Sequence, residues 1–312
     1  MNAVVLAGGI RSGLEVPGSG LPRALWPFPD EPLISHVLRF LTRSGCRDIA
    51  ICANGKTKLI AAELASGETL WQSLHYSEDP LPRGPAGCLK DLQEWTGSHT
   101  LLCIQGTAWY DFDLAAMMDE HCRSAAAITV GALQTGHLHL EPAGVYFIEP
   151  YMLDLVPPVG YHDIKEQLIP KAIAAGMRVH CHPLRGQAAL IHSPEHYLIA
   201  MRSAIRRAAA EPPADFIRCN DTIIHVTATV SSTAHLSGPI WIDAGAVVEE
   251  GVMLLGPVVV GTDVAIGADS LIRRSVVLRG ACIPANSEAF SCILSPTKAR
   301  RRSPSARLSA RG

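Results

Sequence analysis

The chain contains 312 residues with a formal net charge of −2, and 48% of its residues are hydrophobic while 18% are charged. This balance supplies enough apolar side chains for a core and excludes wholesale disorder, and the length suits two domains. The near-neutral charge argues against nucleic acid as a partner. No apolar run reaches the ~18 residues of a membrane helix, and the nine cysteines include no CxxC pair, so the sequence predicts a cytoplasmic protein with reduced thiols and no membrane contact.

The first two hundred residues alternate short β-rich segments with helical patterns. Strands are expected at Ala3–Leu6, Asp48–Cys52, Thr100–Cys103 and Ala127–Val130. Apolar residues at helical spacing predict helices from Leu33 to Leu41, ahead of Gly45, and over Leu114–Cys122. This alternation is typical of a doubly wound, mostly parallel, Rossmann-like α/β sheet. Because such sheets bind ligands beyond the carboxyl ends of their strands, we expect the site in the loops after Leu6, Tyr76 and Cys103.

The pattern changes after a connector that we expect over 208–222. Aliphatic residues then recur at every sixth position: Ile224, Val230, Leu236, Ile242, Val248, Leu254, Val260, Ile266, Ile272 and Leu278. A six-residue period fits neither a helix nor a flat strand, but it fits a parallel β-helix in which each rung buries one aliphatic side chain. We therefore predict a domain over 1–207, a short β-helix over 223–294, and a basic, disordered tail over 295–312.

Several motifs in chain order resemble those of the sugar-1-phosphate nucleotidyltransferases, also called NDP-sugar pyrophosphorylases. The matching segments are Leu6-Ala7-Gly8-Gly9, Leu21-Pro22-Arg23, Glu31-Pro32-Leu33-Ile34, Glu78-Asp79-Pro80-Leu81, Gly84-Pro85-Ala86-Gly87, Gly144-Val145-Tyr146-Phe147 and Ser193-Pro194-Glu195. A hexapeptide β-helix behind the catalytic domain is also similar to that family's architecture. The resemblance implies a nucleotidyltransferase-like first domain and left-handed winding of the β-helix.

The resemblance also implies a reaction, in which a nucleoside triphosphate and a sugar 1-phosphate give an NDP-sugar and pyrophosphate. It assigns Arg11 and Arg23 to the phosphates as the candidate catalytic residues. The nucleotide would contact Leu6, Ala7, Gly8, Gly9, Glu78, Pro85, Ala86 and Gly87. The sugar would lie near Glu141 and Gly144. Mg²⁺ would be required if the chain is active.

The chain departs from the family pattern where the metal is expected. The two aspartates that hold Mg²⁺ in the family align with Thr107 and Leu190, and the family's lysine aligns with Arg23. Mg²⁺ prefers carboxylate oxygens, so a hydroxyl and an aliphatic side chain predict no metal site here. Asp111 and Asp113 follow Thr107 closely and are the alternative ligands.

Several interpretations stay open from the sequence. Leu6–Gly9 could instead form a tight turn without a ligand, Arg23 could be a solvated loop charge, and 85–87 could simply cap a helix. The pairs His137/His139 and His180/His182 lack the third ligand of a metal site. The arginines at 273, 274, 279 and 300–302 could form a solvated end of the chain or contact an acidic protein or nucleic acid. A β-helix can also indicate an acyltransferase.

Two functions therefore follow from the sequence. The first is a sugar-1-phosphate nucleotidyltransferase whose activity is weakened or lost. The second is a non-catalytic subunit of the same lineage that binds a nucleotide or a sugar nucleotide in a regulatory or scaffold role. The β-helix predicts association into a homo-oligomer or with a related catalytic subunit, because it exposes flat faces and strand edges.

Overall fold

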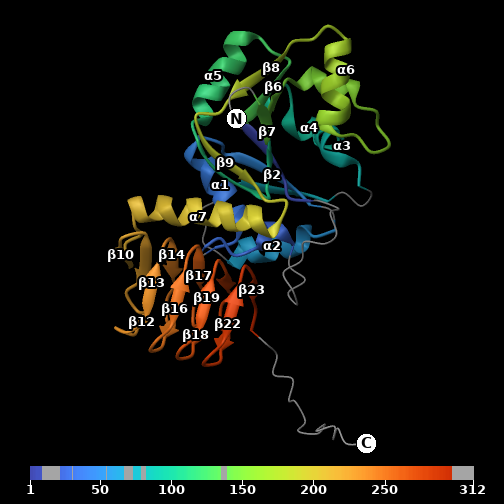
Figure 1. Cartoon of the computed structure of the whole chain (residues 1–312). Coiled ribbons are helices and arrows are strands. Elements are labelled where there is room, and N and C mark those ends of the chain that lie inside the picture. The colour runs from blue at the N-terminus through green and yellow to red at the C-terminus, as the bar shows by residue number, and fades with distance from the viewer. Residues whose placement is uncertain are drawn as a thin grey trace, which may run out of the picture. The chain divides into compact units, whose positions relative to one another are not determined.

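The computed structural model describes residues 1–8, 22–29, 31–53, 55–66, 73–78, 82–134 and 139–296. The described chain divides into two compact units, residues 1–204 and 205–296 (Figure 1). Within the described residues no helix is both long and apolar enough to span a bilayer.

A seven-stranded mixed sheet forms the centre of the first unit. Its strands, in spatial order, are β3 (Ser73–Ser77), β2 (Asp48–Cys52), β1 (Asn2–Leu6), β4 (Leu101–Gln105), β7 (Leu140–Ile148), β6 (Ile128–Gln134) and β8 (Val179–Pro183). The first four are mutually parallel, β7 runs antiparallel to both β4 and β6, and β8 is parallel to β6. The mostly parallel α/β sheet expected from the sequence is confirmed.

Helices cover both faces of this sheet because successive strand side chains point to opposite sides. The core on one face packs α1 (Leu33–Arg43), α2 (Thr57–Ser66) and α5 (Leu114–Ser124) against the sheet. The core on the other face packs α3 (Gly84–Asp91), α4 (Gln93–Thr96), α6 (Ile169–Ala174) and the short helices η2 (Pro150–Leu155) and η3 (Ile164–Leu168). On β1, Val5 joins the first core and Val4 the second, which explains why Ala3–Leu6 are all apolar.

Three smaller elements complete the first unit. The short helix η1 (Arg23–Leu25) precedes α1, and β5 (Ala108–Phe112) pairs antiparallel with β9 (Gly186–Leu190) outside the main sheet. Helix α7 (Pro194–Ala210) begins in the first unit and ends in the second.

The second unit is a short parallel β-helix built from three sheets. One sheet contains β10 (Phe216–Cys219), β11 (Thr222–His225), β14 (Ile240–Ile242), β17 (Val258–Val260), β20 (Val276–Val277) and β23 (Ile293–Leu294). A second contains β12 (Thr229–Val230), β15 (Val247–Val248), β18 (Ala265–Ile266) and β21 (Cys282–Ile283). The third contains β13 (His235–Ser237), β16 (Met253–Leu255), β19 (Leu271–Arg273) and β22 (Glu288–Phe290). All neighbouring strands are parallel except β10, which runs antiparallel to β11.

The predicted six-residue period holds through Ile272 and then shifts by one residue. Ile242 pairs with Val260, eighteen residues later, whereas Val260 pairs with Val277, seventeen residues later. Val277 therefore lies in the buried interior, and the expectation that Leu278 fills that place is wrong. The turn that absorbs the missing residue contains Arg274 in a left-handed conformation, with φ of +47°. The segment 208–222, which the sequence predicts to be a connector, contains the end of α7 and the strand β10.

Candidate functional site

The carboxyl ends of four parallel strands form one edge of the central sheet. Leu6, Cys52 and Gln105 end β1, β2 and β4, and they lie side by side because Leu6 is in register with both of the others. The Leu6 carbonyl accepts a hydrogen bond from the Gly106 amide at 2.9 Å, which joins the loops after β1 and β4. A Cβ on Gly106 would lie 2.8 Å from Val5 Cγ1, so glycine is required for this close approach.

The first two residues of the loop after β1 are hydrogen-bonded to the end of β2. The amides of Ala7 and Gly8 both donate to the Cys52 carbonyl, at 2.8 and 3.1 Å. These two amides therefore have protein partners, and a phosphate on this loop would have to bind at later positions. Gly9 and Arg11, which the sequence assigns to that role, lie outside the described residues.

Strands β5 and β9 bring together the two positions at which the resemblance expects metal aspartates. Ala108 is in register with Leu190, and the Ile191 amide donates to the Thr107 carbonyl at 3.0 Å. Thr107 is 8% exposed and Leu190 is half-buried. The motif assignment thus identified two spatial neighbours, although they are far apart in the sequence.

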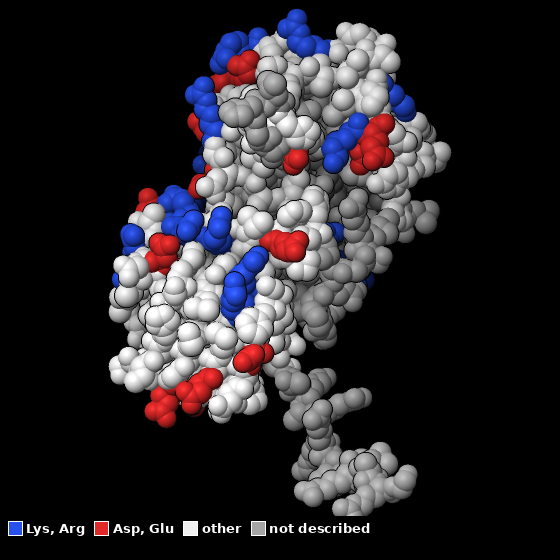
Figure 2. Space-filling view, in the orientation of Figure 1, with Lys and Arg blue, Asp and Glu red and all other residues white. Residues whose placement is uncertain are grey.

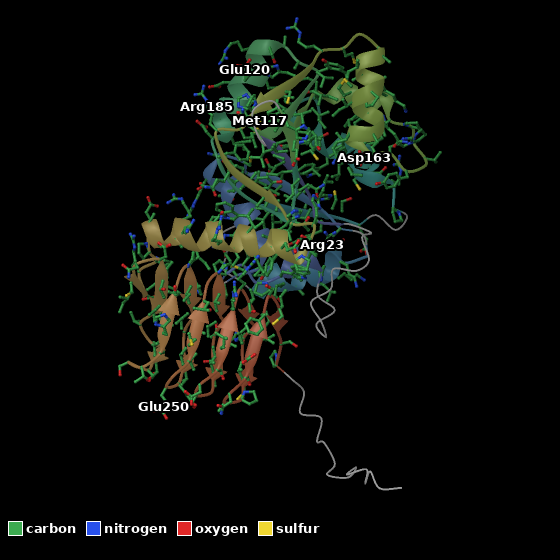
Figure 3. All side chains as sticks on the ribbon, viewed as in Figure 1. Arg23, Met117, Glu120, Asp163, Arg185 and Glu250 are labelled. Atoms are coloured by element: carbon green, nitrogen blue, oxygen red, sulfur yellow. The ribbon has the colours of Figure 1, made fainter. Side chains whose placement is uncertain are left out.

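Arg23 and Gly144 border the same two positions. Arg23 Nη1 donates to the Ile191 carbonyl at 3.2 Å, and Figure 3 shows Arg23 close to the amino-terminal end of α7. Gly144 has φ of +72°, and a Cβ built on it would lie 2.8 Å from Leu190 Cδ2 and 2.7 Å from Gln105 Cγ. The Leu190 side chain therefore packs over the backbone at Gly144, in the place where the family pattern puts a carboxylate.

Tyr110 holds the backbone at Ala143 and Gly144 in place, and the sequence analysis did not identify it. Its hydroxyl donates to the carbonyl oxygens of Ala143 and Gly144, at 3.2 and 3.4 Å. Burial raises the pKa of Tyr110 well above its ordinary value, so the hydroxyl stays protonated and remains a donor. The only signal in the sequence is that Tyr110 follows the Gln105-Gly106-Thr107 motif on an aromatic strand.

The loop that opens α3 lies at the same edge and is held by a second segment. The Ala86 amide donates to the His162 carbonyl at 2.9 Å, and the His162 amide donates to the Arg83 carbonyl at 2.7 Å. Gly84 has φ of +76°, and a Cβ at this position would lie only 2.6 Å from the same His162 oxygen. Residues 85–87 lie in the first turn of α3, where Ala86 and Gly87 are buried and Arg83 is the N-cap residue.

Glu78 and Glu141 occupy the two sides of this edge. Glu78 follows β3 and is exposed, one strand beyond Cys52, whose register partner is Ser77. Glu141 begins β7 and is also exposed, with its carboxylate 3.5 Å from His139 Nε2. The two carboxylates therefore lie on opposite sides of the edge, with the ends of β2, β1 and β4 between them.

The described residues do not offer Mg²⁺ a ligand set at Thr107 and Leu190. No group of three His, Cys, Asp or Glu side chains that could hold a metal occurs in the described part of the chain. The alternative ligands do not reach the site: Asp113 caps α5 by accepting from the Ala116 amide at 3.1 Å, and Asp111 lies near the far end of β5, opposite Gln187.

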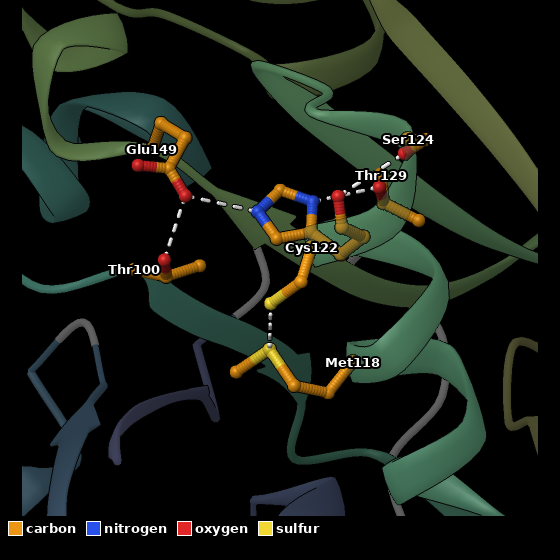
Figure 4. A network of polar contacts seen from close by, with 7 residues as sticks. Thr100, Met118, Cys122, Ser124, Thr129 and Glu149 are labelled. Carbon is orange, nitrogen blue, oxygen red and sulfur yellow. Dashed lines mark hydrogen bonds and ion pairs between the residues drawn. The ribbon is translucent and has the colours of Figure 1, made fainter.

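A polar network at the opposite edge of the sheet has the composition of a catalytic triad but lies in the interior (Figure 4). His121 Nδ1 lies 2.7 Å from Thr129 Oγ1, and its Nε2 lies 3.0 Å from a Glu149 oxygen that also accepts from Thr100 at 2.6 Å. Thr129 is fully buried and His121 is 2% exposed, so no substrate reaches the hydroxyl. The network joins α5 to the ends of β4, β6 and β7 and is structural.

Comparisons with known proteins agree with this geometry. Residues 2–139 match the family model described as Nucleotidyl transferase. Mannose-1-phosphate guanylyltransferase of Mycobacterium tuberculosis is 22% identical, over 91% of this chain and 82% of that protein. UTP–glucose-1-phosphate uridylyltransferase of Synechocystis is 21% identical, over 89% and 82%. The crystal structure of HddC from Yersinia pseudotuberculosis, complexed with GMP-PN, covers 65% of this chain and 98% of that one with a TM-score of 0.56 and 14% identity, which shows a shared fold.

Proposed function

We propose a function from the premise that the first domain of this chain belongs to the nucleotidyl transferase family, among homologues of sugar-1-phosphate guanylyl- and uridylyltransferases. The domain binds a nucleotide or a sugar nucleotide at the carboxyl edge of its sheet, and nucleotidyl transfer to a sugar 1-phosphate is weakened or lost. A cytoplasmic location is part of the proposal, because the family is typically cytoplasmic.

The observation that carries the proposal is that the β5–β9 pair makes Thr107 and Leu190 neighbours, with Leu190 in register with Ala108 and Thr107 bonded to Ile191. Transfer needs concentrated positive charge at the phosphorus under attack, which this family typically supplies with Mg²⁺. A hydroxyl and an isobutyl group give the ion no carboxylate, while the Arg23 guanidinium, which donates to the Ile191 carbonyl beside them, still offers a cation for a phosphate. Support for binding is therefore stronger than support for turnover.

Guanosine and uridine compounds are the first probes, because the relatives with the longest alignments carry guanylyl- and uridylyltransferase names. Calorimetry with GTP, UTP, GDP-mannose and UDP-glucose should show saturable binding, and pyrophosphate release from GTP plus mannose 1-phosphate should be far below that of an active relative assayed in parallel. Turnover at an ordinary enzyme rate that Arg23→Ala abolishes would instead establish a working enzyme. Absence of binding to every probe at millimolar concentration would refute the proposal.

A second copy of the chain is the partner that we propose for the β-helix, at the outer face of the sheet β13-β16-β19-β22. The outward side chains form two columns: His235, Met253, Leu271 and Glu288, and beside them Ser237, Leu255, Arg273 and Phe290. Phe290 is 50% exposed and Met253 is 42% exposed, and Figure 2 shows few charged side chains on the β-helix surface facing the viewer.

Self-association is favoured over a dissimilar partner because this face carries one charge of each sign beside its apolar residues. A two-fold axis through the face can place Arg273 of one copy against Glu288 of the other around Phe290. Light scattering should show a dimer that Phe290→Asp converts to a monomer, whereas Val226→Asp, at an exposed apolar residue after β11, should leave the mass unchanged. A monomeric wild-type chain would refute this surface.

A further inference from the structure

The positions where a divalent cation would be expected hold no carboxylate, because Thr107 offers only a neutral hydroxyl and Leu190 offers no ligand atom. Thr107 and Leu190 adjoin through the β5–β9 pair, and Leu190 Cδ2 lies over the backbone at Gly144. A hard cation needs several oxygen ligands, and leaving its charge beside an aliphatic side chain is unfavourable. The residues at these positions therefore do not suit the expected metal, and another group has to neutralise the phosphates of a bound nucleotide.

A permanent positive charge is anchored next to these two positions. Arg23 Nη1 donates to the Ile191 carbonyl at 3.2 Å, and the Ile191 amide donates to the Thr107 carbonyl at 3.0 Å. The guanidinium is thus one residue from Leu190 along β9 and joined through Ile191 to Thr107. An arginine stays charged at any physiological pH and presents five N–H donors in a planar fork that matches phosphate oxygens.

We infer that Arg23, at the position of the family's lysine, is the cation left to face the phosphates without a metal, so that the site prefers the metal-free form of its nucleotide ligand. This inference rests on the proposed function and specifies the ionic form of the ligand at the same site. A free nucleoside triphosphate brings its full negative charge to the guanidinium. The magnesium complex brings two charges fewer and also carries a cation toward Arg23, with no carboxylate at 107 or 190 to receive it.

The consequence is that Mg²⁺ weakens nucleotide binding, which is opposite in sign to the behaviour of a site that uses the metal. Calorimetry of the full chain with GTP, and separately with UTP, is carried out in EDTA and in excess Mg²⁺ at equal ionic strength. Affinity should be about tenfold higher in EDTA, the effect of losing roughly one charge-assisted contact. Arg23→Ala should lower the metal-free affinity ~10–100-fold and remove the difference between the two conditions.

Two further variants keep the test independent of folding and of the proposed function. Arg47→Ala, at the amino end of β2 and the opposite edge of the sheet, should leave both affinities unchanged. Thr107→Asp combined with Leu190→Asp should make Mg²⁺ favourable for binding, while Thr107→Asn with Leu190→Asn, neutral and of similar size, should not; circular dichroism checks that each is folded. Tighter wild-type binding in Mg²⁺, or an unchanged metal-free affinity in Arg23→Ala, overturns the inference while the proposed function stands. Absence of nucleotide binding in both conditions overturns the proposed function itself.

Discussion

Replacing Gly144 by alanine should destabilise the first domain through two separable effects. The backbone at Gly144 has φ of +72°, a left-handed conformation that costs a residue with a Cβ about 1–2 kcal/mol. The new Cβ would also lie 2.7 Å from Gln105 Cγ and 2.8 Å from Leu190 Cδ2, closer than carbon atoms tolerate. Overpacking of this kind costs about 1–3 kcal/mol, so Gly144→Ala should lower the free energy of unfolding by about 2–5 kcal/mol.

Gly176→Ala is the matched control for this experiment. Gly176 has φ of +74°, and a Cβ built there would meet no atom within 4 Å, so the substitution carries the backbone cost alone. Hydrogen exchange read peptide by peptide follows the first domain separately from the β-helix. Leu190→Ala should relieve part of the crowding, so the double variant with Gly144→Ala should be about 1 kcal/mol more stable than additive effects predict. Equal costs for Gly144→Ala and Gly176→Ala, or strict additivity with Leu190→Ala, would show that Leu190 does not pack over Gly144.

Two other buried groups give predictions of pH dependence and reactivity. Burial, with a further contribution from Arg39, lowers the pKa of His36 to about 3, even though Glu31 lies 3.3 Å away. Near pH 6.5 only the unfolded chain therefore binds a proton at this histidine. The stability is full above that pH and falls as the pH is lowered. Between pH 6.5 and 5 the wild type should lose about 1.5 kcal/mol more than His36→Gln, as measured by urea unfolding, and identical losses would contradict the assignment. Burial raises the pKa of Cys46 to about 11, so at pH 8 iodoacetamide should label the exposed Cys122 and spare Cys46 until the chain is unfolded, and equal labelling of the two in the folded chain would contradict it.

The β-helix shows how far a repeat pattern determines a structure. Interior positions through Ile272 follow the six-residue period because each rung has to bury one side chain. The shift to Val277 could not be read from the sequence, since residues 276–278 are all aliphatic and either register satisfies the pattern. Only the pairing with Val260 across neighbouring coils decides between them.

In the candidate site, too, features set by neighbouring residues could be predicted from the sequence, whereas contacts between distant segments could not. The strand end at Leu6 could be placed from the sequence because two glycines follow it at once, whereas the strand expected to end at Cys103 continues to Gln105. The contact of Thr107 with Ile191 depends on the β5–β9 pair, and short strands far apart in the chain carry no local signal of their pairing. The role of Tyr110 was missed for that reason, because its hydroxyl donates to carbonyl groups 33 and 34 residues later in the chain.

Net charge explains why binding and catalysis can separate in such a site. Two aspartates and one Mg²⁺ sum to zero, and so do Thr107 and Leu190 without an ion, so replacing the whole set leaves unchanged the net charge that a bound phosphate chain meets. A set without the ion has no divalent charge focused on the phosphorus under attack, and stabilisation of the transition state depends on that focus. The guanidinium of Arg23, at the position of the family's lysine, keeps a single positive charge but spreads it over a planar group. A site built in this way can bind the phosphates of the substrate and still catalyse transfer only slowly. Calorimetry and pyrophosphate release, measured on the same sample, would distinguish this combination from simple loss of the site.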